Sequence, residues 1–375
     1  MDPRKETDVN DPRLGKLAKL LVEYCLAVQP QDLFVIRTSP LATPLVQELV
    51  RYALRAGAYP YCRVELEGLQ EIFFHEATEE LLHFLSPLDL FEIENVNAWL
   101  SLLAPFNTKA LAGSDPARQI AWQKTRYPIT KRYMERDGDG TLRWSVALYP
   151  NQANAQDAGM SLADYTEFVF SAVHLDEEDP SLYWVNFSKE QARLSEALAK
   201  GSEIRILGPG TDLTVRVQGR KWINSDGHKN MPDGEIFTAP LETSANGHVF
   251  FSFPAIYQSR EFEGVRLLFR DGEVIKAEAR TGEDFLEKIL QIDNGARRIG
   301  EFAFGTNFGI QQFTKDILFD EKIGGTLHLA LGHAIGSTGG TNVSAIHWDM
   351  ICDLRQDAEV RLDGEVIQRN AQWKI

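Results

Sequence analysis

The pattern of hydrophobic and polar positions changes about halfway along the chain. In the first half, segments with helical periodicity alternate with short apolar segments typical of strands. The predicted order is helix 14–28, strand 32–37, helix 44–56, strand 59–66, helix 77–85, strand 97–104 and helix 162–175. Such alternation indicates βαβ units around a parallel sheet. Ser161 is a candidate N-cap for the last of these helices.

After a predicted helix at 189–200, the pattern becomes one of short alternating strands bounded by turn residues. These strands are predicted at 203–207, 213–218, 248–253, 265–269 and 274–280, and a helix at 282–290. Asp271-Gly272 and Asp363-Gly364 are hairpin turn signals. We therefore predict an α/β N-terminal domain with a mostly parallel sheet, residues 1–185, and a β-rich α+β C-terminal domain, residues 186–375.

Composition and charge narrow the classes of function. Hydrophobic residues make up 43% and charged residues 25% of the chain, as in ordinary globular proteins. The net charge of −15 opposes binding to nucleic acid. No apolar run is long enough to span a membrane, and the charged N-terminal segment does not resemble a secretory signal, so we expect a cytoplasmic protein. Three widely spaced cysteines support neither a disulfide framework nor a thiolate metal site.

Candidate chemistry is concentrated in the second half, in segments 230–240, 300–307 and 319–349, where His, Asp and Glu lie among glycines and apolar residues. His347 and Asp349 are two apart in the strand-like run 345–351, so both should project from one face. His328 lies in the strand-like run 325–331, where a buried ring needs a polar partner. Glu235 and Glu301 each directly follow a glycine and begin an apolar segment.

Two imidazoles and three carboxylates suit zinc, cobalt or manganese, and the lack of thiolates favours a catalytic over a closed structural metal site. On the residues alone, a second interpretation stays open. The histidines could be hydrogen-bonded core residues, and the carboxylates could serve turns or helix caps.

The segments above resemble the M29 family of metallo-aminopeptidases, also called the aminopeptidase T/S family. Further motifs that carry the resemblance are 155–161, 179–180, 211–215, 222–226 and 319–325, so the likeness extends over nearly the whole chain. The family's metal ligands are two Glu, two His and one Asp. The resemblance places them at Glu235, Glu301, His328, His347 and Asp349, and all five are present.

The resemblance implies that two divalent metal ions activate a water molecule to hydrolyse the N-terminal residue from short peptides. It also implies a homodimer. Whether Glu235 or Glu301 bridges the ions, which metal is physiological and which side chains are preferred stay open. Asp320 and Glu321 are candidates either for orienting a ligand or for the general base, and the sequence does not choose between them.

One position departs from the family pattern. Where family members carry a tyrosine thought to assist the transition state, this chain has Ile335. His333 could replace the lost polar contact, or could be an ordinary loop histidine. Two alternative functions follow: a homologue that binds peptide or metal without catalysis, and a different metallo-amidohydrolase.

Overall fold

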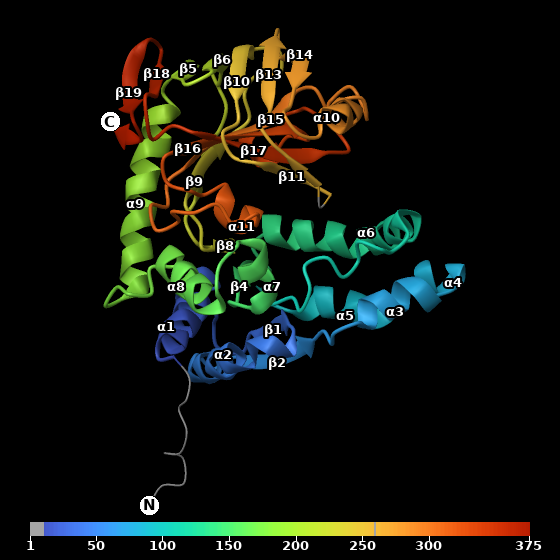
Figure 1. The fold of residues 1–375 in the computed structure, drawn as a ribbon. Coiled ribbons are helices and arrows are strands. Elements are labelled where there is room, and N and C mark those ends of the chain that lie inside the picture. The colour runs from blue at the N-terminus through green and yellow to red at the C-terminus, as the bar shows by residue number, and fades with distance from the viewer. Residues whose placement is uncertain (1–10, 259) are drawn as a thin grey trace, which may run out of the picture. The chain divides into compact units, whose positions relative to one another are not determined.

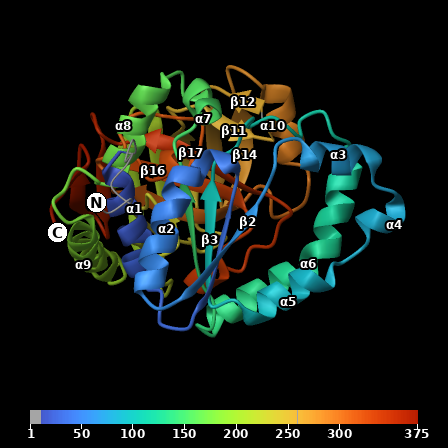
Figure 2. The same cartoon turned by 90° about the horizontal axis from the view of Figure 1, so that it is seen from below.

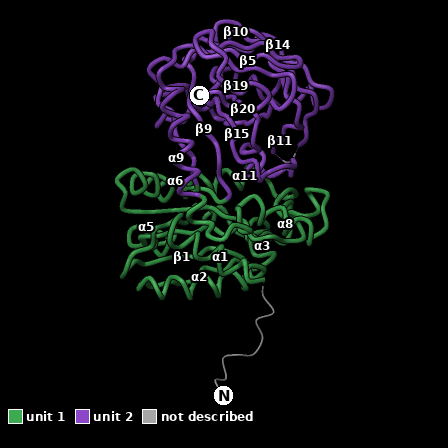
Figure 3. The backbone as a smooth tube through the Cα atoms, turned by 90° about the vertical axis from the view of Figure 1, so that its left-hand side faces the viewer, with its two compact units in different colours: residues 1–183, 227–231 green, residues 184–226, 232–375 purple. Residues whose placement is uncertain are grey.

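The computed structural model describes residues 11–258 and 260–375. The chain divides into two compact units, one of residues 1–183 with 227–231 and one of residues 184–226 with 232–375 (Figure 3). The two units are described separately below. A division at residue 185 between independently folding domains stays a prediction.

The first unit contains a five-stranded sheet in the order β2-β1-β3-β4-β8, and all neighbouring strands run parallel. Its strands are β1 (Leu33–Thr38), β2 (Tyr59–Val64), β3 (Ala98–Leu103), β4 (Arg143–Leu148) and β8 (Asn230–Met231). The predicted parallel sheet is thus confirmed, and strands 32–37, 59–66 and 97–104 match β1, β2 and β3.

The helices of this unit lie mainly between the strands in sequence (Figure 1). They are α1 (Arg13–Lys19), continued by a π-helical turn (Leu20–Cys25), a 3₁₀ turn (Pro40–Ala42), α2 (Thr43–Arg55), α3 (Leu69–Glu76), α4 (Glu79–Leu82), α5 (Pro87–Asn95), α6 (Pro116–Gly138), α7 (Gln152–Asp157) and α8 (Leu162–Ala172). α1 and α2 pack side by side (Figure 2). The side chain of Ser161 caps α8, as predicted.

The helix predicted at 77–85 is present but shorter, as α4. Ala77 is extended and ends α3, and the Thr78 hydroxyl accepts a hydrogen bond from the Leu81 amide to begin α4. This N-cap places the start of the helix two residues later than predicted, and the helix ends at Leu82. The prediction also missed α5 and α6, which begin at Ser86-Pro87 and Asp115-Pro116. A capping residue followed by proline at the first helical position is a recognisable start signal.

α9 (Pro180–Leu198) leads into the second unit, whose strands form two large antiparallel sheets. One sheet has the order β14-β13-β10-β6-β5-β18-β19-β20, and the other has the order β17-β16-β15-β9-β7. The eight-stranded sheet consists of β5 (Glu203–Gly208), β6 (Thr211–Arg216), β10 (Asn246–Phe250), β13 (Arg266–Arg270), β14 (Glu273–Glu278), β18 (Glu359–Leu362), β19 (Glu365–Arg369) and β20 (Gln372–Trp373).

The five-stranded sheet consists of β7 (Ile223–Ser225), β9 (Glu235–Thr238), β15 (Ile299–Gly305), β16 (Thr326–Gly332) and β17 (His347–Asp353). The remaining elements are β11 (Ala255–Tyr257), β12 (Arg260–Phe262), α10 (Glu283–Ile289), α11 (Ile317–Asp320) and a 3₁₀ turn (Gly336–Thr338). Inward-facing side chains of both large sheets form one hydrophobic core, which confirms the predicted β-rich second half.

Both predicted hairpins are present. Asp271-Gly272 joins β13 to β14, and Asp363-Gly364 joins β18 to β19. All four residues have positive φ, the conformation that a two-residue type I′ turn requires. In the described part of the chain, no helix has both the length and the apolar character needed to cross a membrane.

Candidate metal centre

The register of the five-stranded sheet places the sequence-predicted ligands on one face. Directly opposed residues of antiparallel strands share a face. Glu301 on β15 lies opposite Ala330 on β16, which in turn lies opposite Asp349 on β17. His328 and His347 are each two positions away along these strands, and therefore point to the same side.

Small residues alternate with the polar ones on this face. Glu235 on β9 lies opposite Gly305, and His328 lies opposite Ala303. With Ala330, these small residues leave space for the longer polar side chains to converge. The intervening positions of β16 are leucines buried in the hydrophobic core. One face of the sheet thus stabilises the fold, and the other presents the polar groups.

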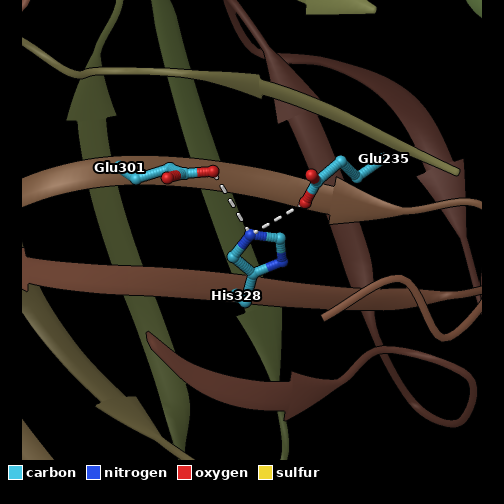
Figure 4. A group of neighbouring side chains, drawn as sticks. All are labelled: Glu235, Glu301 and His328. Atoms are coloured by element: carbon cyan, nitrogen blue, oxygen red, sulfur yellow. Dashed lines mark ion pairs between the residues drawn. The ribbon is translucent and has the colours of Figure 1, made fainter. Parts of the chain in front are cut away.

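The side chains converge through Glu301. The His328 Nε2 atom lies 3.3 Å from Glu235 Oε2 and 3.4 Å from Glu301 Oε1 (Figure 4). The His347 Nε2 atom lies 3.3 Å from the other Glu301 oxygen, Oε2, and 3.6 Å from Asp349 Oδ1. Glu301 therefore presents one oxygen to each imidazole. This is the arrangement expected of a carboxylate that bridges two cations.

A third group of potential ligands adds Glu321 to His328 and Asp349, with one ligand atom of each within 4.8 Å of the others. Glu321 directly follows α11, and its Oε1 accepts a hydrogen bond from Lys322, whose side chain is fully buried. From the sequence, Glu321 was predicted only for an orienting or general-base role. Its possible role as a ligand was not predicted, because the residue lies outside any strand whose periodicity would fix the direction of its side chain.

Asp320, the neighbouring candidate, is engaged elsewhere. Its Oδ1 accepts hydrogen bonds from the Thr314 amide at 2.7 Å and from the Thr314 hydroxyl at 2.9 Å. Burial raises the pKa of Asp320 to about 8, against the lowering effect of these bonds. Asp320 belongs to none of the three ligand groups, and its contacts fix the loop that precedes Glu321.

Several of these polar atoms are buried without hydrogen bonds to any described residue. They are both ring nitrogens of His328, Glu235 Oε2 and Asp349 Oδ1. Leaving such a group unsatisfied costs about 1–3 kcal/mol. His328 Nε2 faces Glu235 Oε2 at 3.3 Å, and Asp349 Oδ1 faces His347 Nε2 at 3.6 Å, so cations bound within these pairs would satisfy His328 Nε2, Glu235 Oε2 and Asp349 Oδ1. The nitrogen and oxygen donors fit a divalent transition metal.

The electrostatics of the cluster favour positive charge. Burial lowers the pKa of His328, but Glu301 and Glu235 outweigh burial and raise the pKa to about 9. For His347, Asp349 and Glu301 likewise outweigh burial and raise the pKa to about 11. Burial, with the nearby Glu321 charge, raises the pKa of Glu235 well above its ordinary value. A field that holds extra protons in this way also attracts metal cations.

One backbone contact orients His347. Its Nδ1 lies 2.9 Å from the His333 carbonyl oxygen. A carbonyl can only accept, so Nδ1 carries the proton and Nε2 is directed to the carboxylates. The ring of His333 is exposed, and Ile335 is half-buried at the start of the following 3₁₀ turn.

Comparisons with known proteins agree with this chemistry. The sequence profile of the family described as "Thermophilic metalloprotease (M29)" matches residues 10–373. Aminopeptidase 2 of Geobacillus stearothermophilus is 30% identical over an alignment that covers 97% of this chain and 98% of the relative. Aminopeptidase PepS of Streptococcus thermophilus is 30% identical, covering 96% and 98%.

A solved structure, wild-type AmpT from Thermus thermophilus, superposes with a TM-score of 0.80 at 25% identity, covering 97% of this chain and 99% of that one. This structural match supports a fold that combines an α/β part with a β-rich part. This chain belongs to the M29 family of metalloproteases and is a metal-dependent peptidase.

Proposed function

We propose that this protein is a dinuclear metallo-aminopeptidase that removes the N-terminal residue from short peptides. The observation that carries the dinuclear part is the position of Glu301, whose two oxygens face two different imidazoles at 3.4 and 3.3 Å. The aminopeptidase part is supported by relatives that bear this name and align over nearly their whole length.

In this proposal, Glu235, Glu301 and His328 hold one ion, and Glu301, His347 and Asp349 hold the other. Zinc, cobalt and manganese fit these donors. When bound, the ions supply Lewis-acid chemistry and a nucleophile at neutral pH. The buried Lys322 holds Glu321 beside His328 and Asp349, so we assign Glu321 to the ligand set as well.

The other properties expected from the resemblance remain proposals of the same kind. They are a homodimer, short peptides as substrates and a cytoplasmic location. The acidic chain, with its net charge of −15, keeps nucleic acid an unfavourable partner.

The decisive experiment is a panel of aminoacyl chromogenic substrates, assayed with added zinc, cobalt or manganese, beside short peptides with free or acetylated N-termini. We expect metal-dependent release of the first residue and no cleavage of the acetylated peptides. Equal cleavage of acetylated peptides would contradict an aminopeptidase.

Two further outcomes identify the alternative functions. Bound metal without turnover of any substrate would indicate a homologue that binds without catalysis. Hydrolysis of small non-peptide amides alone would indicate a different amidohydrolase. Metal analysis of the same samples should give two ions per chain, and one ion per chain would contradict the bridging role of Glu301.

A further inference from the structure

The first unit contains a cavity, lined by both charged and apolar side chains, that the proposed function does not use. Its volume is about 490 Å³, within the usual range for small-molecule sites. Arg37 and Arg63, each one residue from the end of its strand, lie opposite each other on β1 and β2. Because both arginines line the cavity, it lies near the carboxyl ends of these parallel strands, where α/β folds commonly bind ligands. Residues of α3 and α6 also line the cavity.

Two of the three arginines that line the cavity are already paired. The Arg63 guanidinium forms ion pairs with Asp89 and Glu92, and the Arg126 guanidinium forms one with Asp89. The Asp89 side chain is only 6% exposed, so these bonds are well shielded from water. Arg63 and Arg126 are therefore held in fixed positions with most of their charge balanced.

The third arginine, Arg37, is poorly neutralised. Its one hydrogen bond to a described residue runs from Nη2 to Glu65 Oε1 at 3.4 Å, and the Glu65 side chain is 53% exposed. A guanidinium has five N–H donors, so most of them remain available. Burial and the neighbouring Arg63 lower the pKa of Arg37. An anion beside this side chain would accept hydrogen bonds from donors that are otherwise unused.

An aromatic wall adjoins the arginines. The rings of Phe73 on α3 and Trp122 on α6 are 4.7 Å apart, and the Arg126 guanidinium lies 5.2 Å from the Trp122 ring. Both aromatic side chains line the cavity. Flat apolar surfaces of this kind favour contact with a ring. The cavity thus offers free donors to an anion and a stacking surface to an aromatic group.

We propose that this cavity binds a small aromatic monocarboxylate, with the carboxylate on Arg37 and the ring against Phe73 and Trp122. The preference for a monoanion follows from the charges around the cavity. Glu65, Asp89 and Glu92 already offset Arg37, Arg63 and Arg126, and among these arginines Arg37 has the weakest pairing. One carboxylate can accept hydrogen bonds from the unused donors of Arg37, whereas a phosphate dianion would add a second negative charge that no further cation among the described lining residues balances. A guanidinium also matches a carboxylate in bidentate geometry. The proposal does not depend on the activity of the metal centre.

Calorimetric titration of the metal-loaded, full-length protein with indole-3-acetate tests it. We expect one binding site per chain, and no binding of indole-3-ethanol, which has the same ring without the carboxylate. Tighter binding of inorganic phosphate than of indole-3-acetate would overturn the assignment to a carboxylate. Equal binding of indole-3-ethanol would overturn the role of the charge.

Variants locate the site. Arg37→Gln should weaken binding at least about tenfold, the usual effect of losing a hydrogen bond between charged groups. Gln123→Glu adds a negative charge to an exposed lining residue with little risk to the fold, and should also weaken binding. Arg51→Gln is the matched control, because Arg51 is 56% exposed on α2 and, among the described residues, bonds only Glu48. Its affinity should equal that of the wild type.

A carboxylate could also bind the metal ions, so the titration is repeated on His347→Ala. Retained binding in this variant supports the cavity of the first unit. Binding that is lost in His347→Ala but kept in both Arg37→Gln and Gln123→Glu would place the ligand on the metals and overturn the proposal. Gln123→Glu leaves the arginines in place, so it still tests the proposal if Arg37→Gln fails to fold.

Discussion

Replacing His347 by alanine, or Asp349 by asparagine, should remove metal-dependent activity and leave the fold in place. His347 is the first residue of β17, and its side chain is 35% exposed, so truncation opens no closed cavity. The loss to the folded state is one hydrogen bond, from Nδ1 to the His333 carbonyl, which is worth about 0.5–1.5 kcal/mol. The loss to the metal centre is an Nε2 ligand that faces both Glu301 and Asp349.

Thermal unfolding distinguishes the loss of fold stability from the loss of metal binding. A metal present at 100 times its Kd stabilises the folded protein by about 2.7 kcal/mol per site. For domains of about 150–250 residues, each kcal/mol corresponds to roughly 2–4 °C in Tm, so one ion should raise Tm by about 5–11 °C. His347→Ala should keep a metal-free Tm within a few degrees of the wild type and lose the part of the metal-induced rise that its ion contributes.

His333→Ala is the matched control. It removes another imidazole from the adjoining loop but keeps the backbone carbonyl that orients His347, and the ring of His333 is exposed. The assay combines thermal shift with metal analysis of the dialysed protein. Wild-type metal content in both His347→Ala and Asp349→Asn would refute the assignment, as would an equal loss of metal in His333→Ala.

Four other outcomes are expected, two from the geometry of the cluster and two from the family resemblance. Chelation should abolish turnover and a divalent transition metal should restore it, since no thiolate is among the proposed ligands; activity that survives exhaustive dialysis against chelator would contradict a catalytic metal. Metal affinity should rise with pH between about 6 and 8, because His328 and His347, whose pKa values are raised to about 9 and about 11, are protonated without metal and must each release a proton to bind it. Competition with a metal indicator measures this, and an affinity that does not change with pH would count against both ligands. Ile335→Tyr should raise kcat, by up to about 10²–10³-fold if a full oxyanion donor is restored, with little change in KM; no gain there, together with a large loss in His333→Ala, would assign that role to His333. Light scattering should show a homodimer of the 42.3 kDa chain, and a species of single-chain mass at working concentration would refute it.

The fold was predictable where local chemistry and periodicity agree. Asp271-Gly272 and Asp363-Gly364 supply the positive φ values that a tight hairpin turn needs, so both hairpins could be placed from two residues each. The helix predicted at 77–85 was too long because apolar residues continue to Leu85, whereas the helix that Thr78 caps ends at Leu82. α6 was missed because its polar surface gives little periodic signal, although Asp115-Pro116 marks its start.

The candidate ligands could be predicted where they lie on strands, because alternation along a strand determines the face to which each side chain points. In β16, leucines at alternate positions face the core, so His328 between them has to point to the other face. The same alternation brings His347 and Asp349 together on β17. The role of Glu321 was not accessible in this way, because it follows a short helix and depends on the buried Lys322 for its direction. Such a contact depends on tertiary packing and produces no periodic pattern in the sequence.

The two halves of the cluster differ in how firmly the fold holds them. His328 and Glu301 lie on β16 and β15, which are hydrogen-bonded to neighbours on both sides, and both side chains are nearly or fully buried. His347 and Asp349 lie on β17 at the edge of the same sheet, where the side chains are 35% and 13% exposed. Truncating His347 or Asp349 therefore leaves the packing around His328 and Glu301 unchanged. Truncating His328 would instead open a cavity among close-packed strands and expose the repulsion between Glu235 and Glu301. For this reason the edge residues, and not His328, separate the loss of metal from the loss of fold.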